Sequence, residues 1–266
     1  MGIRLRRKDS LGLLSKTDRL PSLPCILLEV QAVMNNPESG IMDLVDVIKK
    51  DQSTSAMILK YANSAVYNVS GKKYSNINDA VVRLGMTQAS NVANAMGLMQ
   101  GLMFPADEEE IELFWMHCFG VALMSKMIAL KVDPQEKTMK HEDVFMVGLL
   151  HEIGRVAIAS NVDYCYFSSG IALLSGHEAA LYEKEHYGVT HHEAAGFIMR
   201  AWMFPDVLIE SVEQMQGGDN PIACVCRSAE NIVNNIEKPF TSFNEIIDEV
   251  AQKAFQMEPE GLLCNI

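Results

Sequence analysis

One histidine and one glutamate stand side by side in an otherwise apolar stretch of the sequence. Residues 147–154 read VGLLHEIG, so that His151 and Glu152 are flanked by leucines, an isoleucine and two glycines. Burying an imidazole or a carboxylate without a partner costs free energy, so the pair needs an explanation. Adjacent helical residues diverge by about 100°, and both side chains could still reach one metal ion lodged between helices. Imidazole plus carboxylate suits a first-row divalent cation, or Mg²⁺ bound beside a phosphate.

A purely structural interpretation explains the same segment. His151 can donate to a backbone carbonyl, while Glu152 pairs with Arg155, which lies three residues further on the same side of a helix. Spacing alone favours this interpretation over a metal site.

The other histidines carry weaker signals. His117 lies in the apolar pattern of an expected helix, and His191 and His192 open another, where either can cap the helix or face water. Three are expected in exposed loops or at helix ends: His141, His177 and His186. The sequence contains no nucleophile elbow, phosphate-binding glycine loop or dinucleotide fingerprint.

Helical periodicity runs through nearly the whole chain. It covers residues 40–60, and Asp107 with the three glutamates after it predicts an N-cap and an acidic first turn for a helix that ends near Pro134. A further helix is expected from His141 through Ile153, and later ones start near residues 175, 191, 205, 221 and 242. Sustained alternation typical of strands is absent from the sequence, which predicts an all-α protein.

The best boundary between two helical halves lies at 101–107, after an apolar, methionine-rich helix. Met96, Met99 and Met103 share one face of that helix. Such a stripe is either adaptable core filling or a groove for a partner, and core filling is the commoner case.

Composition excludes several classes of protein. The 266 residues are 48% hydrophobic and 21% charged, as in an ordinary globular chain of one large or two small domains. The net charge is 22 − 34 = −12. Nucleic acids and anionic membranes attract Lys and Arg, so general nucleic-acid binding and membrane attachment are not expected.

The cysteines and the N-terminus point to a cytoplasmic protein. The six cysteines are scattered, and Cys224-x-Cys226 lacks the second pair of a metal site, so all are expected as reduced thiols. Residues 1–17 form a basic arm, either amphipathic or frayed, too polar for a signal peptide. There is no unbroken run of 18 apolar residues, and no membrane-spanning helix is expected.

A series of short motifs follows one order through residues 18–235. The first half contains Leu20-Pro21-x-Leu23-Pro24, Lys50-Asp51, Ala62-Asn63-Ser64 with Tyr67, Asp79-Ala80 and Leu84-Gly85. The second half contains Trp115-x-His117, the segment 148–155 (GLLHEIGR), Gly188-x-x-His191, Trp202 and Pro205. In this order the chain resembles an HDOD domain, a bacterial signalling relative of the HD-type metal-dependent phosphohydrolases.

The resemblance implies an all-helical fold of two subdomains, the second an HD-like helical bundle. It implies an HDOD domain at 18–240, with a first subdomain at 18–105 and a second at 106–266. In HD phosphohydrolases a His, a His-Asp pair and a later Asp hold the metal. His117 and His151 match the histidines, Glu152 stands at the position of the first Asp, and Glu230 lies near the last acid. His191 matches a histidine common in HDOD domains.

Two departures from the HD phosphohydrolase pattern argue against hydrolase activity. Glu152 is one methylene longer than Asp, which moves the carboxylate by more than about 1 Å, and a misplacement of that size can cost about 100-fold in rate. Residues 212–216 (VEQMQ) lack a histidine pair often found there. HDOD domains are in any case generally regarded as non-catalytic.

Two residues of the N-terminal signature have both a structural and a functional interpretation. Asp51 resembles an N-cap, and Asn63 sits where a helix ends, with left-handed geometry or an amide that ties the turn. The alternative is that Asp51 and Asn63, like His191, bind a ligand, the first two in a pocket between the subdomains.

The sequence therefore supports two hypotheses. The favoured one is a non-catalytic signal-transduction module that needs no cofactor and binds a protein partner or a small ligand, such as a nucleotide. The alternative is a metal-dependent phosphohydrolase whose divalent cation is held by His117, His151, Glu152 and Glu230. Whether the chain is an enzyme stays open, although the incomplete motif argues against it.

Overall fold

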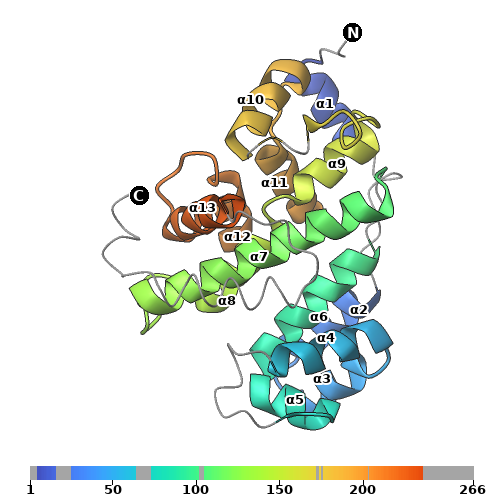
Figure 1. Cartoon of the computed structure of the whole chain (residues 1–266), viewed down its shortest axis with the longest axis vertical. Coiled ribbons are helices and arrows are strands. Elements are labelled where there is room, and N and C mark those ends of the chain that lie inside the picture. The colour runs from blue at the N-terminus through green and yellow to red at the C-terminus, as the bar shows by residue number, and fades with distance from the viewer. Residues whose placement is uncertain are drawn as a thin grey trace. The chain divides into compact units, whose positions relative to one another are not determined.

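The computed structural model describes residues 5–15, 25–63, 73–101, 105–171, 174, 176–202 and 204–235. All regular structure in these ranges is helical, which confirms the predicted all-α class (Figure 1). The chain divides into two compact units, with residues 25–101 in the smaller one and residues 5–15 and 105–235 in the larger one.

The smaller unit is built around the helix that follows Gly85. Helices α2 and α4 pack against this helix, α6, and α3 and α5 complete the unit. The bounds are α2 (Cys25–Asn35), α3 (Ile41–Ile48), α4 (Gln52–Ala62), α5 (Ile77–Leu84) and α6 (Met86–Gly101). The helical pattern predicted over 40–60 is thus two helices, because Asp51 caps the start of α4. Met96 is buried, as expected for core filling, whereas the side chains of Met99 and Met103 and the start near 242 lie outside the described residues.

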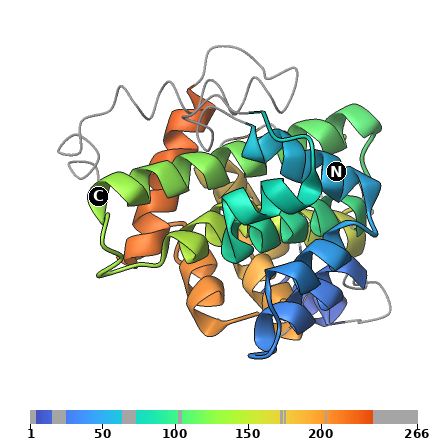
Figure 2. The same cartoon turned by 90° about the horizontal axis from the view of Figure 1, so that it is seen from below.

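The larger unit is organised by its longest helix, α7. Helices α8 and α13 pack along α7, and α9 packs against α11 (Figure 2). The bounds are α1 (Arg7–Leu14), α7 (Glu108–Val132), α8 (His141–Leu150), α9 (Ile153–Asn161), α10 (Gly176–Tyr187), α11 (His191–Ala201), α12 (Asp206–Glu213) and α13 (Pro221–Asn234). The predicted N-cap is confirmed: Asp107 accepts from the Glu110 backbone at 2.8 Å, and Glu110 accepts from that of Asp107 at 3.0 Å.

Helix α7 is long and apolar enough to cross a membrane, which the sequence analysis did not expect. Its most apolar 18-residue window has a mean hydropathy of 1.6. However, 72% of that window is buried inside the protein, so α7 is the core helix of a soluble helical domain.

The helix expected from His141 through Ile153 is in fact two helices. Helix α8 ends at Leu150, and α9 begins at Ile153, so the His151-Glu152 pair forms the junction. Two glycines flank the junction and allow close helix approach: a Cβ on Gly148 would lie 2.7 Å from the Cα of Ala122, and one on Gly154 would overlap the backbone of α11. The absence of a side chain at the two glycines therefore allows α8 to pack closely on α7 and α9 to pack closely on α11. The junction is buried between these helices as a result.

The N-terminal segment is held by backbone contacts, in contrast to a frayed arm. The Leu5 amide donates to the carbonyl of His186 at 2.7 Å, and the Ser10 hydroxyl donates to that of Tyr187 at 2.6 Å. Ser10 and Leu14 are buried, and α1 packs on α9 and α11. Helix α1 is consequently part of the larger unit.

Candidate metal and ligand site

Four side chains from two helices and one helix junction converge inside the larger unit. His117 comes from α7, His151 and Glu152 from the junction, and Glu230 from α13. One potential ligand atom of each lies within 4.8 Å of those of the other three. The structure thus brings together all four residues that the family resemblance marked for a metal.

His151 is oriented as a metal ligand would be. Its Nδ1 lies 2.7 Å from the carbonyl oxygen of Gly148, as the structural interpretation predicted. A carbonyl only accepts, so Nδ1 carries the proton and the neutral ring keeps a lone pair on Nε2. Nε2 is buried and has no hydrogen-bond partner among the described residues. Burial lowers the pKa of His151 to about 4, which keeps the ring neutral.

Glu152 is shared between the histidines and an arginine. Its Oε1 lies 3.7 Å from Nε2 of His151 and 3.9 Å from Nε2 of His191. Its Oε2 forms an ion pair with Nε of Arg155, the partner expected from the spacing. Both side chains of that pair are at least 95% buried. Burial opposes ionisation, but the Arg155 guanidinium and the nearby imidazoles hold the pKa of Glu152 well below its usual range.

Glu230 is the second acid of the cluster and differs from Glu152. Burial and the charge of Glu152 raise the pKa of Glu230. The charge of Glu152 disfavours ionisation of Glu230, because the two carboxylates repel each other.

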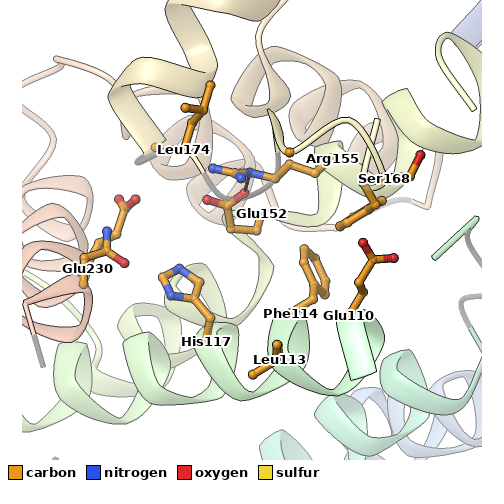
Figure 3. A pocket seen from close by; sticks show the side chains of 13 residues that line it. Glu110, Leu113, Phe114, His117, Glu152, Arg155, Ser168, Leu174 and Glu230 are labelled. Carbon is orange, nitrogen blue, oxygen red and sulfur yellow. Dashed lines mark ion pairs between the residues drawn. The ribbon is translucent and has the colours of Figure 1, made fainter. Parts of the chain in front are cut away.

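A cavity of about 550 Å³ opens beside the four residues. Figure 3 shows His117 rising from α7, with Glu152 and Arg155 opposite and Glu230 to one side. Leu113, Phe114, Phe167 and Leu174 supply apolar wall, so that the lining combines apolar side chains with the polar groups of the cluster. This size and this mixed lining are typical of small-molecule sites. Phe167 and Leu174 carry no motif, and sequence analysis missed them.

A buried hydrogen-bond network, which the sequence pattern did not reveal, orients His191 next to the site. Glu183 Oε2 accepts from the backbone amide of His191 at 2.6 Å and lies 2.7 Å from its Nδ1. The Tyr166 hydroxyl donates to the other oxygen of Glu183. Although burial acts the other way, the carboxylates of Glu183 and Glu152 raise the pKa of His191. Glu183 lies in a highly charged stretch (EKEHY) that resembles a solvated helix face, which conceals its role.

Expectations for the remaining histidines were partly wrong. His191 and His192 are buried instead of facing water, and His141 is buried with Nε2 2.8 Å from the carbonyl of Asp133. His177 is exposed and His186 half-buried, as expected for helix ends. Burial of these rings depends on tertiary packing, which the local sequence pattern does not reveal.

Asp51 and Asn63 have clear structural roles in the smaller unit. Asp51 accepts from the Thr54 amide at 2.6 Å as the N-cap of α4. Asn63 ties the turn, with its amide donating to Leu59 and accepting from the Tyr74 backbone at 2.8 Å. Its φ of −91° shows that the left-handed geometry considered for it was wrong. Ligand binding by Asp51 and Asn63 stays a prediction.

The described cysteines are free thiols. Cys118, Cys224 and Cys226 are buried, Cys25 and Cys165 are exposed, and Cys264 lies outside the described residues.

The fold and the His/His-Glu/Glu cluster define a relative of the HD-type helical proteins. The family model of the HDOD domain matches residues 20–217, and the chain belongs to this family. A curated protein of Treponema pallidum, described as uncharacterized, is 27% identical over 153 residues, which are 58% of this chain but only 29% of that protein.

Solved structures share the fold. A candidate phosphohydrolase from Shewanella amazonensis is 25% identical with a TM-score of 0.69, over 94% of this chain and 96% of that one. An HDOD domain protein of unknown function from Geobacter sulfurreducens is 21% identical with a TM-score of 0.70, over 97% and 87%. A candidate signal transduction protein from Marinobacter aquaeolei is 21% identical with a TM-score of 0.66, over 97% and 62%. The names of these neighbours thus include both of the function classes that the sequence suggested.

Proposed function

We propose that this chain is a non-catalytic signal-transduction module that uses its HD-type cavity to bind a small ligand or a segment of a partner protein. The observation that carries the proposal is the buried ion pair between Glu152 and Arg155. Glu152 stands at the position of the metal-binding Asp of HD phosphohydrolases, and an internal guanidinium already supplies the positive charge that a metal would bring. This fixed cation also repels a divalent cation from the cluster.

The lining of the cavity supports binding as its role. Phe114 and Phe167 form an edge-to-face pair, with ring centroids 5.9 Å apart, on the apolar wall. His117, Glu152 and Glu230 offer polar contacts in the same cavity. A small ligand with a flat ring and hydrogen-bonding groups, such as a nucleotide, or the tip of a partner's loop fits this mixed lining.

The experiment is a combined metal and activity measurement on protein purified without chelator. We expect well below one metal ion per chain, and no hydrolysis of p-nitrophenyl phosphate, bis(p-nitrophenyl) phosphate or cyclic dinucleotides above the level of His151→Ala. Stoichiometric metal together with hydrolysis that His151→Ala abolishes would refute the proposal.

A second candidate function is a metal-dependent phosphohydrolase, and the convergence of His117, His151, Glu152 and Glu230 favours it. Two neutral imidazoles and two carboxylates are a suitable donor set for a divalent cation. When bound, such a cation would supply Lewis acidity and neutralise phosphate charge. In that case Glu152 would use Oε1, since Oε2 is paired with Arg155.

A further inference from the structure

A second, smaller cavity of about 210 Å³ lies beside the first in the larger unit. Four segments meet around it: the starts of α10 and α11, the turn after α12 and one face of α13. Its lining consists of Gly176, His177, His192, Met215, Gln216, Arg227, Glu230, Asn231 and Asn234. It shares Gly176, Glu230 and Asn234 with the larger cavity, while His117, Glu152 and Arg155 line only the larger one.

His192 distinguishes this cavity from ordinary packing. Its side chain is 97% buried, and neither ring nitrogen has a hydrogen-bond partner among the described residues. The other buried histidines of the unit each use at least one nitrogen: His141 on Asp133, His151 on Gly148 and His191 on Glu183. A buried imidazole with two unsatisfied nitrogens costs stability, so His192 calls for a functional explanation.

The charges around the cavity balance, which favours an uncharged occupant. Arg227 is anchored to the protein, with Nη1 donating to the carbonyl of Gln214 at 2.8 Å and Nη2 to that of Gly218 at 2.7 Å. Its charge is opposed by the carboxylate of Glu230 in the same wall. The other polar groups include the neutral ring of His192 and the amides of Gln216 and Asn231, which offer both donors and acceptors.

The volume limits the size of the occupant. At about 30 Å³ per water, the cavity has room for roughly seven water-sized groups. This is the size of one six-membered ring with its substituents, and much less than a whole drug-sized ligand.

We propose that the smaller cavity binds an uncharged cyclic amide, a ring that carries adjacent N–H and C=O groups, with His192 and Asn231 as its hydrogen-bonding contacts. Such a group can be a free molecule or the end of a longer ligand that continues past Gly176 into the larger cavity. The proposal does not depend on whether the larger cavity binds a metal or catalyses a reaction.

Uracil is the probe, and 1,3-dimethyluracil is its matched control because it keeps both carbonyls but lacks both N–H donors. The full chain, labelled with ¹⁵N-histidine and held in chelator, is titrated with each compound and followed by the ring-nitrogen signals of His192. We expect uracil to shift these signals saturably and the dimethyl compound to bind about ten-fold more weakly. Acetate, a charged probe, should leave the signals unchanged. No shift with uracil up to its solubility limit, or equal binding of both pyrimidines, would overturn the proposal.

Two variants test the contacts. His192→Phe keeps an aromatic ring but removes both nitrogens, and we expect about ten-fold weaker uracil binding, measured by calorimetry. Asn231→Ala changes an exposed side chain and should fold normally, so it provides the same test if His192→Phe is unstable. His186→Phe, at a histidine outside the cavity, is the control and should bind uracil like the wild type. Unchanged affinity in His192→Phe and Asn231→Ala, or an equal loss in His186→Phe, would contradict the assignment. Metal content and hydrolysis are measured separately, so the function proposed above can fail without affecting this result.

Discussion

Removing Arg155 tests whether an internal cation has taken the place of a metal. In Arg155→Met, the carboxylate of Glu152 stays 97% buried but loses the guanidinium that pairs with it. Breaking a buried ion pair from one side costs about 3–5 kcal/mol. At about 2–4 °C per kcal/mol for a domain of this size, the melting temperature should fall by roughly 6–20 °C. His191 lies 3.9 Å from Oε1 of Glu152 and compensates part of the loss, so we expect the lower half of this range.

The assay is thermal unfolding in chelator, followed by tryptophan fluorescence. Both tryptophans of the chain, Trp115 and Trp202, are buried in the larger unit, so the signal reports on the unit that contains the site. The matched variants are Glu152→Gln, which removes the carboxylate charge that faces Arg155, and the double variant, which removes both charges. We expect each single variant to be clearly less stable than the double variant, because replacing a whole buried pair is often neutral.

The metal arm of the experiment links stability to function. Without the guanidinium, the ligand set of His117, His151, Glu152 and Glu230 has no competing cation, so Mn²⁺ should stabilise Arg155→Met more than the wild type. Saturation at about 100 times the dissociation constant corresponds to about 2.7 kcal/mol. An unchanged melting temperature of Arg155→Met in chelator would refute the argument. A double variant whose loss of stability equals the sum of the two single losses would also refute it. Equal stabilisation of the wild type and Arg155→Met by Mn²⁺ would do the same.

The remaining predictions concern packing and protonation near the junction. The pKa of His151 is about 4 in the folded protein and about 6.5 when unfolded, so its stability contribution is complete above pH 6.5 and is lost as the pH falls towards 4. In urea unfolding with chelator, the free energy of unfolding of His151→Asn should therefore depend less steeply on pH than that of the wild type, by up to about 1.4 kcal/mol per pH unit. An identical slope for the two proteins would contradict this. Gly154→Ala should destabilise by about 1–3 kcal/mol or more because its Cβ meets backbone, whereas Gly12→Ala, in open space on a helix, should stabilise by about 0.5–1 kcal/mol. Melting temperatures that move the same way in both glycine variants would count against the close crossing. Glu183→Gln should lower the pKa of His191 in an NMR titration, and an unmoved pKa would mean that Glu183 does not control it.

Local sequence signals were sufficient for most of the helices and for singling out His151 and Glu152, for a physical reason. Caps and apolar periodicity are local signals, and the Asp107 capping box and the start of α8 at His141 followed from them. His151 and Glu152 were found because two polar residues interrupt an apolar run. Glu230 came only from the family resemblance, because its position in the cluster depends on how α13 packs on α7.

The parts that could not be predicted are contacts between distant segments. Glu183 and His192 look like surface residues in the sequence, since charged and polar neighbours surround them. They are buried because α11 packs on α9 and Glu183 of α10 meets His191 of α11, a property of the tertiary arrangement. The break between α8 and α9 was missed for a similar reason: the apolar pattern continues through it, and only the approach of α7 and α11 to the two glycines requires the chain to turn there.

The departure of Glu152 from the HD pattern and the presence of Arg155 can be understood as one feature. Glu152 immediately precedes α9 and Arg155 follows in its first turn, so the two side chains meet across three residues at the start of that helix. The additional methylene of Glu allows Oε2 to pair with Arg155 while Oε1 still faces His151 and His191. An Asp at this position would be more than about 1 Å shorter and would have to give up one set of contacts, and a misplacement of that size is enough to impair catalysis. The longer side chain that departs from the HD pattern thus fits an internal ion pair, in agreement with the binding function proposed above.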